Sequence, residues 1–380
     1  MIECKFITNG IAIGYDGVVK PCCIWKSDSE WKNENHYSTI DIESWHSSPL
    51  MRKKQEMLAQ DSWPSNCSSC KYYESNNRTD SMRGNGNSAY SHYSDSDLTL
   101  EIRPGTVCNL ACQSCWPEAS SRVAGFYHRA GILDRADLKS KSIVDFEFLN
   151  PVKDRIRDVV ILGGEPFYDK NCLNFLSWAV ENLNANILIF TNGLYIDYDF
   201  IEKYKSKITL IFSIDAIDRH AEYIRYGSDW KTIEQNYYRC RDYDHVEVRV
   251  NVTTSVYNFY YLYDLFEYLL QDWPDLVTLG IAEQPKFGVT AIPIDNRKVI
   301  VDRLGKLIDL IDQSDVRLDQ KQNTESVVRS IVNNLNEQPF DDRNYTSLVK
   351  FIQQMDQVKN ISINDYCPEL ADILNISNKV

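Results

Sequence analysis

Residues 100–116 read LEIRPGTVCNLACQSCW, an apolar segment of strand character followed by a loop that carries three cysteines. These cysteines, Cys108, Cys112 and Cys115, have the spacing Cys-x-x-x-Cys-x-x-Cys. Three thiolates spaced in this way can ligate three irons of a cubane cluster and leave the fourth iron open. A zinc site or a buried group of cysteines is the alternative, although zinc favours cysteine pairs two residues apart and needs a fourth ligand.

A second motif follows the next predicted strand. Residues 161–166 read ILGGEP, so that Gly163, Gly164, Glu165 and Pro166 stand where the strand ends. Two glycines at this position allow a ligand to approach the backbone, and a proline fixes the exit of the turn. Alone, the motif would indicate an ordinary glycine turn, but here it follows the three-cysteine loop at the next strand end.

The three-cysteine loop followed by GGEP resembles the radical S-adenosylmethionine (SAM) superfamily, whose fold is a partial (β/α)6 barrel. The resemblance implies that the three cysteines hold a four-iron four-sulfur cluster whose open iron binds the amino and carboxylate groups of SAM. It also implies that the glycines and the glutamate of GGEP contact the methionyl amino group. The cluster would then deliver one electron to SAM and release a 5'-deoxyadenosyl radical, which abstracts a hydrogen atom from a substrate.

Further SAM contacts are expected at later strand ends. Trp116, directly after the third cysteine, resembles the adenine-contacting residue of the family. Hydroxyl, amide, carboxylate and guanidinium groups that suit the ribose or methionyl part of SAM follow at Thr191, Asn192, Ser213, Asp215, Arg249 and Asn251. Packing at the strand end or capping is the alternative for each of these residues. In residues 220–230, HAEYIRYGSDW, Tyr223 and Arg225 either face the substrate or tie down a loop.

The N-terminal segment has a cysteine pattern of its own, formed by Cys4, Cys22, Cys67 and Cys70. With Gly17, this pattern resembles SPASM and twitch domains, which implies a second, fully ligated four-iron four-sulfur cluster and leaves Cys23 as a spare. It departs from the family because such domains usually follow the barrel. A zinc ribbon with the same four ligands is the alternative.

The chain after residue 97 alternates between strand and helix patterns. Apolar runs of strand length recur at residues 98–102, 158–162, 186–190, 208–214, 246–252 and 276–281, with amphipathic stretches between them. This alternation predicts an α/β fold with a parallel sheet, in agreement with a partial (β/α)6 TIM-like barrel. We therefore expect a Cys-rich twitch-like domain (1–73), a Ser- and Asn-rich linker (74–97), the barrel (98–296) and a helical C-terminal extension (297–380).

Composition limits the class of protein. The 380 residues carry a formal net charge of -13, which disfavours nucleic-acid binding as the main activity. The N-terminal residues do not resemble a secretory signal, and no run approaches the length of a membrane span. We expect a cytoplasmic protein without a membrane partner, whose eleven cysteines are thiols or metal ligands.

The cysteine and GGEP motifs do not specify the substrate. SPASM and twitch relatives often modify ribosomal peptides, so the resemblance favours a peptide or protein substrate and an oxidoreductase-like reaction. A small metabolite or nucleoside is the second choice. A low-potential donor such as flavodoxin or ferredoxin would supply the electron. The alternative of another class is a non-enzymatic, zinc-binding interaction protein, for which the GGEP motif would have no purpose.

Overall fold

The computed structural model describes residues 2–75, 81–134, 142–205, 208–272, 277–282 and 284–376. It contains two compact units. The first comprises Met1–Val107, Ser140–Phe190 and Asp197–Thr209, and the second comprises Cys108–Lys139, Thr191–Ile196 and Leu210–Val380. Each unit is described by itself.

The strands belong to one mostly parallel sheet with the order β2-β1-β3-β4-β5-β6-β7-β8. Their bounds are β1 Gly10–Ile13, β2 Val19–Lys20, β3 Leu98–Ile102, β4 Ile156–Ile161, β5 Asn186–Thr191, β6 Ile208–Ser213, β7 Val246–Thr254 and β8 Val277–Ile281. Six of them, β3 to β8, follow in chain order with helices between. This confirms the predicted α/β class and agrees with a partial (β/α)6 barrel. Leu276, expected at the start of the last strand, lies outside the described residues.

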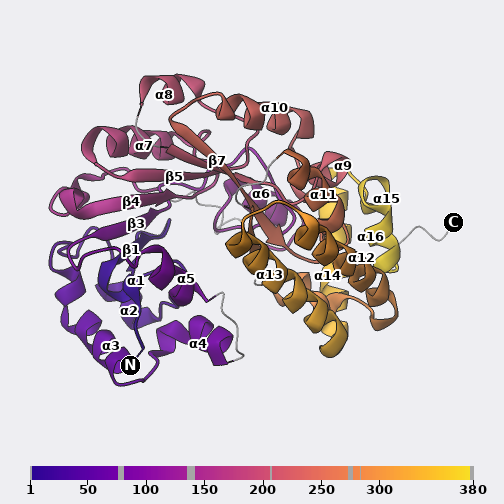
Figure 1. The fold of residues 1–380 in the computed structure, drawn as a ribbon, viewed down its shortest axis with the longest axis horizontal. Helices are drawn as coiled ribbons and strands as arrows, with labels where there is room; N and C mark the ends of the chain where they lie inside the picture. Colours follow the sequence, from indigo (N-terminus) through magenta and orange to yellow (C-terminus); the bar gives the residue numbers. More distant parts are fainter. Residues whose placement is uncertain are drawn as a thin grey trace. The chain divides into compact units, whose positions relative to one another are not determined.

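In the first unit, β3 pairs in parallel with both β1 and β4, and β4 pairs in parallel with β5 (Figure 1). Strand β3 (LTLEI) alternates apolar with polar residues, and its apolar Leu98, Leu100 and Ile102 are all completely buried. Thr99, on the other face, is buried as well, as in a parallel strand covered on both faces. The helices of this unit are α1 Lys5–Asn9, α2 Ser29–Glu34, α3 Pro49–Ala59, α4 Ser68–Ser75, α5 Met82–Ala89, α7 Lys170–Asn182 and α8 Tyr198–Lys203.

The N-terminal segment has two features that the sequence pattern did not indicate. Strand β1 extends the same sheet as the barrel strands through its pairing with β3. The expected linker, residues 74–97, contains helix α5, whose first turn is capped by the hydroxyl of Ser81. Gly86 lets α5 lie against Phe6, because a Cβ atom there would be 2.1 Å from the Phe6 ring. The Ser-, Asn- and Gly-rich composition therefore reflects capping and close packing, and the domain boundaries stay a prediction.

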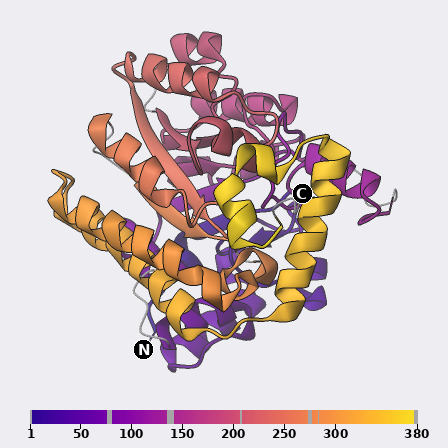
Figure 2. The same ribbon diagram turned by 90° about the vertical axis from the view of Figure 1, so that its right-hand side faces the viewer.

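The second unit contains the other helices: α6 Ser121–Arg129, α9 Asp218–Ile224, α10 Trp230–Arg241, α11 Leu262–Asp272, α12 Ile294–Gln313, α13 Leu318–Glu337, α14 Asp342–Lys359, α15 Ile363–Tyr366 and α16 Pro368–Ile373. Helices α12 and α13 pack along each other (Figure 2), and α14 contacts α6. The helical C-terminal extension is thus confirmed. None of the described helices is both long and apolar enough to cross a membrane.

Candidate active site

The GGEP turn in the first unit packs directly against backbone. The N–H of Gly164 donates to the carbonyl of Gly105 (3.2 Å), and the N–H of Glu165 donates to that of Val107 (2.9 Å). A Cβ atom on Gly164 would lie 2.1 Å from the Val107 oxygen, and one on Gly163 would lie 2.8 Å from the Gly105 oxygen. Both positions therefore exclude any side chain. The turn thereby fixes residues 105–107, which lead directly into Cys108.

Asp169 supports the same segment, and sequence reasoning missed it. Its buried carboxylate accepts the N–H of Val107 (2.8 Å) and also caps helix α7 through the N–H of Asn171 (2.9 Å). The only signal in the sequence was its position directly before a helix. Glu165 and Pro166 are buried as well, and a carboxylate oxygen of Glu165 accepts the N–H of Phe167 at 3.3 Å.

In the second unit, Arg225 lies beside Cys112 of the 108–115 loop. Its guanidinium interacts electrostatically with the thiols of all three cysteines of the loop, and Nη1 lies 4.0 Å from the sulfur of Cys112. Nε pairs with the carboxylate of Asp215 at 2.9 Å, and the Arg225 side chain is only 12% exposed. Burial raises the pKa of the Cys112 thiol, and the charge of Arg225 opposes this. The loop thus holds a buried positive charge suited to three thiolates.

The backbone of this loop is clamped on both sides of Cys112. The N–H of Ala111 donates to the carbonyl of Tyr226 (2.9 Å), and the N–H of Gln113 donates to that of Ile224 (2.8 Å). The ammonium of Lys359, at the end of α14, donates to the carbonyl of Ala111 and to the side chain of Gln113, both at 2.9 Å. Lys359 lies 246 residues from Gln113 in the sequence, so no local pattern could have identified it.

The structure brings some of the other predicted residues to the cysteine loop. The amide of Asn192 donates to Asn109 (2.7 Å), and its nitrogen is 4.0 Å from the sulfur of Cys108. Asp215, besides pairing with Arg225, accepts the N–H of Thr253 at 2.8 Å. The hydroxyl of Thr191 accepts the N–H of Gly193 (3.1 Å). Asn192 and Asp215 therefore belong to the surroundings of the loop.

Other contacts are observed for the remaining predicted residues. Arg249 pairs with Glu247 on its own strand (2.8 Å), and the carbonyl of Asn251 accepts the N–H of Ile214 (3.0 Å). Trp116 is 47% exposed, and Ser213 is half-buried at the end of β6.

Of the two alternatives for residues 220–230, the geometry favours the tying down of a loop. Tyr223 has no exposed surface, and its hydroxyl donates to Asp356 of α14 at 2.9 Å. Arg225 is engaged with Asp215 and the cysteine loop. Both side chains therefore connect the segment after α9 to its neighbours within the second unit.

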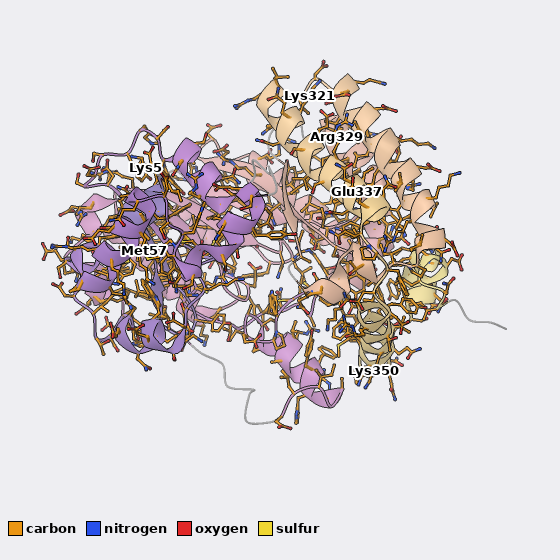
Figure 3. The ribbon with its side chains drawn as sticks, turned by 90° about the horizontal axis from the view of Figure 1, so that it is seen from below. Lys5, Met57, Lys321, Arg329, Glu337 and Lys350 are labelled. Atoms are coloured by element: carbon orange, nitrogen blue, oxygen red, sulfur yellow. The ribbon has the colours of Figure 1, made fainter. Side chains whose placement is uncertain are left out.

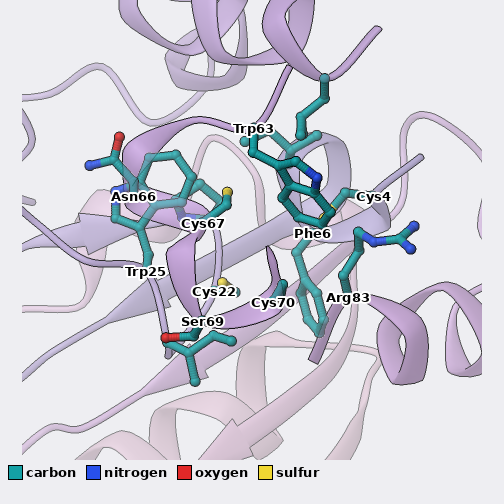
Figure 4. A pocket seen from close by; sticks show the side chains of 14 residues that line it. Cys4, Phe6, Cys22, Trp25, Trp63, Asn66, Cys67, Ser69, Cys70 and Arg83 are labelled. Atoms are coloured by element: carbon teal, nitrogen blue, oxygen red, sulfur yellow. The ribbon is translucent and has the colours of Figure 1, made fainter. Parts of the chain in front are cut away.

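The four N-terminal cysteines line one pocket of the first unit (Figure 4). The thiol of Cys22 interacts electrostatically with those of Cys4, Cys67 and Cys70. Cys23 also interacts electrostatically with Cys22, and it hydrogen-bonds the side chain of Glu101. Among the described residues, no three His, Cys, Asp or Glu side chains are placed as ligands of a single metal ion.

Hydrogen-bond donors surround two of these thiols. The sulfur of Cys4 receives the N–H groups of Ile7 and Phe6 at the start of α1, and that of Cys70 receives those of Arg83 and Met82. Arg83 also lines the pocket, where its guanidinium is held by Glu74 through two hydrogen bonds of 2.8 and 2.7 Å. Backbone N–H groups and a nearby cation both stabilise thiolate ligands.

No family model matches the chain, and no curated protein matches it. Similar solved structures include anSMEcpe with bound AdoMet and Cp18Cys peptide, which is 19% identical over 56% of this chain and 60% of that one, with a TM-score of 0.41. SuiB from Streptococcus suis bound to S-adenosylmethionine is 14% identical over 70% of this chain and 59% of that one, with a TM-score of 0.37.

A third similar structure, spore photoproduct lyase complexed with dinucleoside spore photoproduct, is 12% identical over 85% of this chain and 94% of that one, with a TM-score of 0.35. The match thus spans about 60% of the length of anSMEcpe and of SuiB. At these identities and TM-scores, the similarity carries no conclusion about function.

Proposed function

We propose that this chain is a radical SAM enzyme whose cluster is held by Cys108, Cys112 and Cys115. The observation that supports this most directly is the guanidinium of Arg225, which lies 4.0 Å from the sulfur of Cys112 in a clamped loop and is only 12% exposed. Three thiolates and one open iron are the donor set that a SAM-binding cubane requires, and the residues present fit that group. When bound, the cluster supplies one low-potential electron to the sulfonium of SAM, which then yields methionine and a 5'-deoxyadenosyl radical.

The roles of the protein residues follow from their surroundings. We propose that SAM contacts the backbone of Gly163 and Gly164, where a side chain is excluded because each Cβ position is filled by residues 105–107. Glu165 is proposed to accept the methionyl amino group. Trp116, half-exposed beside the third cysteine, is proposed to contact the adenine. Pro166 is proposed to fix the exit of the same turn.

The polar residues at later strand ends are proposed to contact the ribose or methionyl part of SAM. The set is Thr191, Asn192, Ser213, Asp215, Arg249 and Asn251. Asn192 and Asp215 have the best support, since both belong to the surroundings of the cysteine loop. Arg249 has the least, because Glu247 already pairs with it and would have to release it.

Iron counting after anaerobic reconstitution tests the proposal. We expect about eight irons per chain with both clusters, and about four after Cys108, Cys112 and Cys115 are replaced together by Ala. The reduced protein should convert SAM to 5'-deoxyadenosine slowly without substrate, and the triple variant should not. Unchanged iron content in that variant would show that the loop is not the cluster site.

We further propose that Cys4, Cys22, Cys67 and Cys70 hold a second four-iron four-sulfur cluster. The common pocket and the N–H groups directed at Cys4 and Cys70 support this. Metal analysis separates the proposal from the zinc alternative, since the triple variant of the barrel site should retain iron and sulfide rather than one zinc. If the cluster accepts an electron from the substrate radical, replacing Cys67 and Cys70 by Ala should abolish product and spare the slow cleavage of SAM. Circular dichroism and melting of that variant must show a folded protein.

For the substrate, we propose a peptide or protein, with a small metabolite or nucleoside as the second candidate. Hydrogen abstraction would leave a substrate carbon radical and 5'-deoxyadenosine. With a second cluster as electron acceptor, loss of one further electron and one proton would complete a two-electron oxidation of the substrate. A flavodoxin or ferredoxin in the cytoplasm is the proposed source of the reducing electron. Deuterium transfer from a labelled peptide into 5'-deoxyadenosine would identify such a substrate.

A further inference from the structure

Lys359, the last residue of α14, reaches the cysteine loop from the C-terminal extension. It is only 5% exposed, and its two ammonium hydrogen bonds go to Ala111 and Gln113, the neighbours of Cys112 on either side. The rings of Tyr226 and Phe126 lie 5.2 and 5.7 Å from the ammonium. The cation is therefore enclosed by a carbonyl, an amide oxygen and two aromatic rings.

The main chain of Lys359 takes part in the same connection. The hydroxyl of Tyr226 donates to the carbonyl of Lys359 at 2.8 Å, while the carbonyl of Tyr226 accepts the N–H of Ala111 at 2.9 Å. Lys359, Tyr226 and the loop are thus each hydrogen-bonded to the other two. This arrangement fixes both the loop and the position of the charge.

Burial lowers the pKa of the Lys359 ammonium to about 8, while Cys112, Asp356 and Cys115 oppose this shift and Arg122 adds to it. A buried lysine is costly unless opposite charge compensates it. A negatively charged group held by the cysteine loop would supply that compensation, because the ammonium is fixed by its hydrogen bonds on either side of Cys112.

We propose that Lys359 is a positioning residue that also supplies a positive charge to the cluster held by the cysteine loop. This rests on the proposed function. Reduction adds one negative charge to a cluster, so a cation fixed nearby favours the reduced state that SAM cleavage needs. The C-terminal extension is then a part of the redox site, and Lys359 acts together with Arg225.

The test compares Lys359→Met, which removes the charge, with Lys359→Arg, which keeps it. Lys350→Met is the matched control, since Lys350 is an exposed lysine of the same helix (Figure 3). Iron content is measured first. The midpoint potential is then followed by electron paramagnetic resonance, and the loop cluster is identified by the change that SAM causes in its signal.

We expect the ratio of reduced to oxidised loop cluster in Lys359→Met to fall about tenfold at a fixed potential, a shift of about 59 mV to more negative values. An effect of this size is in the range expected for two unit charges that interact at an effective dielectric constant of about 20. The Arg variant and the Lys350 control should stay within about twofold of the unmodified protein.

Each outcome either supports or refutes the inferred role of Lys359. A full iron content with an unchanged midpoint potential in Lys359→Met would overturn the inference. If that variant loses the cluster, an Arg variant with normal iron and midpoint would support a positioning role for the cation, whereas loss in both would refute it. An unmodified protein that binds no iron at the loop would refute the proposed function itself, which keeps the two failures distinct.

Discussion

The close contact at Gly164 predicts a severe effect for the smallest substitution, Gly164→Ala. The new Cβ atom would lie 2.1 Å from the oxygen and 2.4 Å from the carbonyl carbon of Val107, and neither is the end of a flexible side chain. The backbone must therefore move, at a typical cost of about 1–3 kcal/mol for overpacking. The move also weakens the hydrogen bonds from Gly164 to Gly105 and from Glu165 to Val107, each worth about 0.5–1.5 kcal/mol.

These contributions add up to a loss of about 2–6 kcal/mol in the free energy of unfolding. Urea unfolding of the metal-free protein measures it, and calorimetric titration with SAM of the reconstituted protein measures the effect on binding. Gly305→Ala is the matched control, because Gly305 lies within helix α12 and a Cβ atom there would meet no other atom within 4 Å. That change should stabilise the chain by about 0.5–1 kcal/mol. Unfolding within 0.5 kcal/mol of the unmodified protein for Gly164→Ala would refute the packing argument.

Three further predictions concern single side chains. Asp169→Asn should lower the free energy of unfolding in urea by about 1–2 kcal/mol, because a single amide oxygen cannot accept the N–H groups of both Val107 and Asn171 as the two carboxylate oxygens do. The control Asp199→Asn, on the surface, should change it little. Tyr223→Phe should cost about 0.5–1.5 kcal/mol, because it leaves the half-buried Asp356 carboxylate with one donor fewer; an unchanged melting temperature would contradict this. His46 is half-buried with Nε2 3.0 Å from the carbonyl of Gly10, and its partial burial lowers its pKa from 6.5 to about 4. Below about pH 6.5 the unfolded chain therefore binds a proton that the folded chain does not. The contribution of His46 to the free energy of unfolding is complete above about pH 6.5 and falls by up to ~3 kcal/mol toward pH 4. His46→Gln should reduce this pH dependence, as measured by unfolding curves at several pH values.

The sequence was sufficient for the features that depend on local pattern. Pattern and length placed all six strands of the barrel region, because the apolar residues of buried strands such as β3 (LTLEI) and β6 (ITLIFS) stand out from the polar segments around them. The glycines at 163 and 164 were recognisable for a related reason, since a backbone contact that excludes Cβ atoms leaves glycine as the single choice.

The remaining features depend on contacts between distant parts of the chain. Lys359 and Asp356 lie on an amphipathic helix, and nothing in its period indicates that two of its polar residues face the segment after α9 and the cysteine loop. The extension of the sheet by β1 was missed because four residues before a cysteine-rich stretch carry too little pattern to identify their partner strand. Helix α5 was missed because its composition is that of a loop and its packing on Phe6 is tertiary.

The pairing of β1 with β3 also determines how the chain can be shortened. Residues 10–13 cover the edge of β3 with a parallel strand that is buried along its whole length. A chain that begins at residue 98 would expose that edge with its unpaired N–H and C=O groups. Such exposed edges pair with strands from other molecules. Supplying residues 1–97 as a separate polypeptide would offer the missing neighbour, so aggregation of the shortened chain should decrease as the fragment is added.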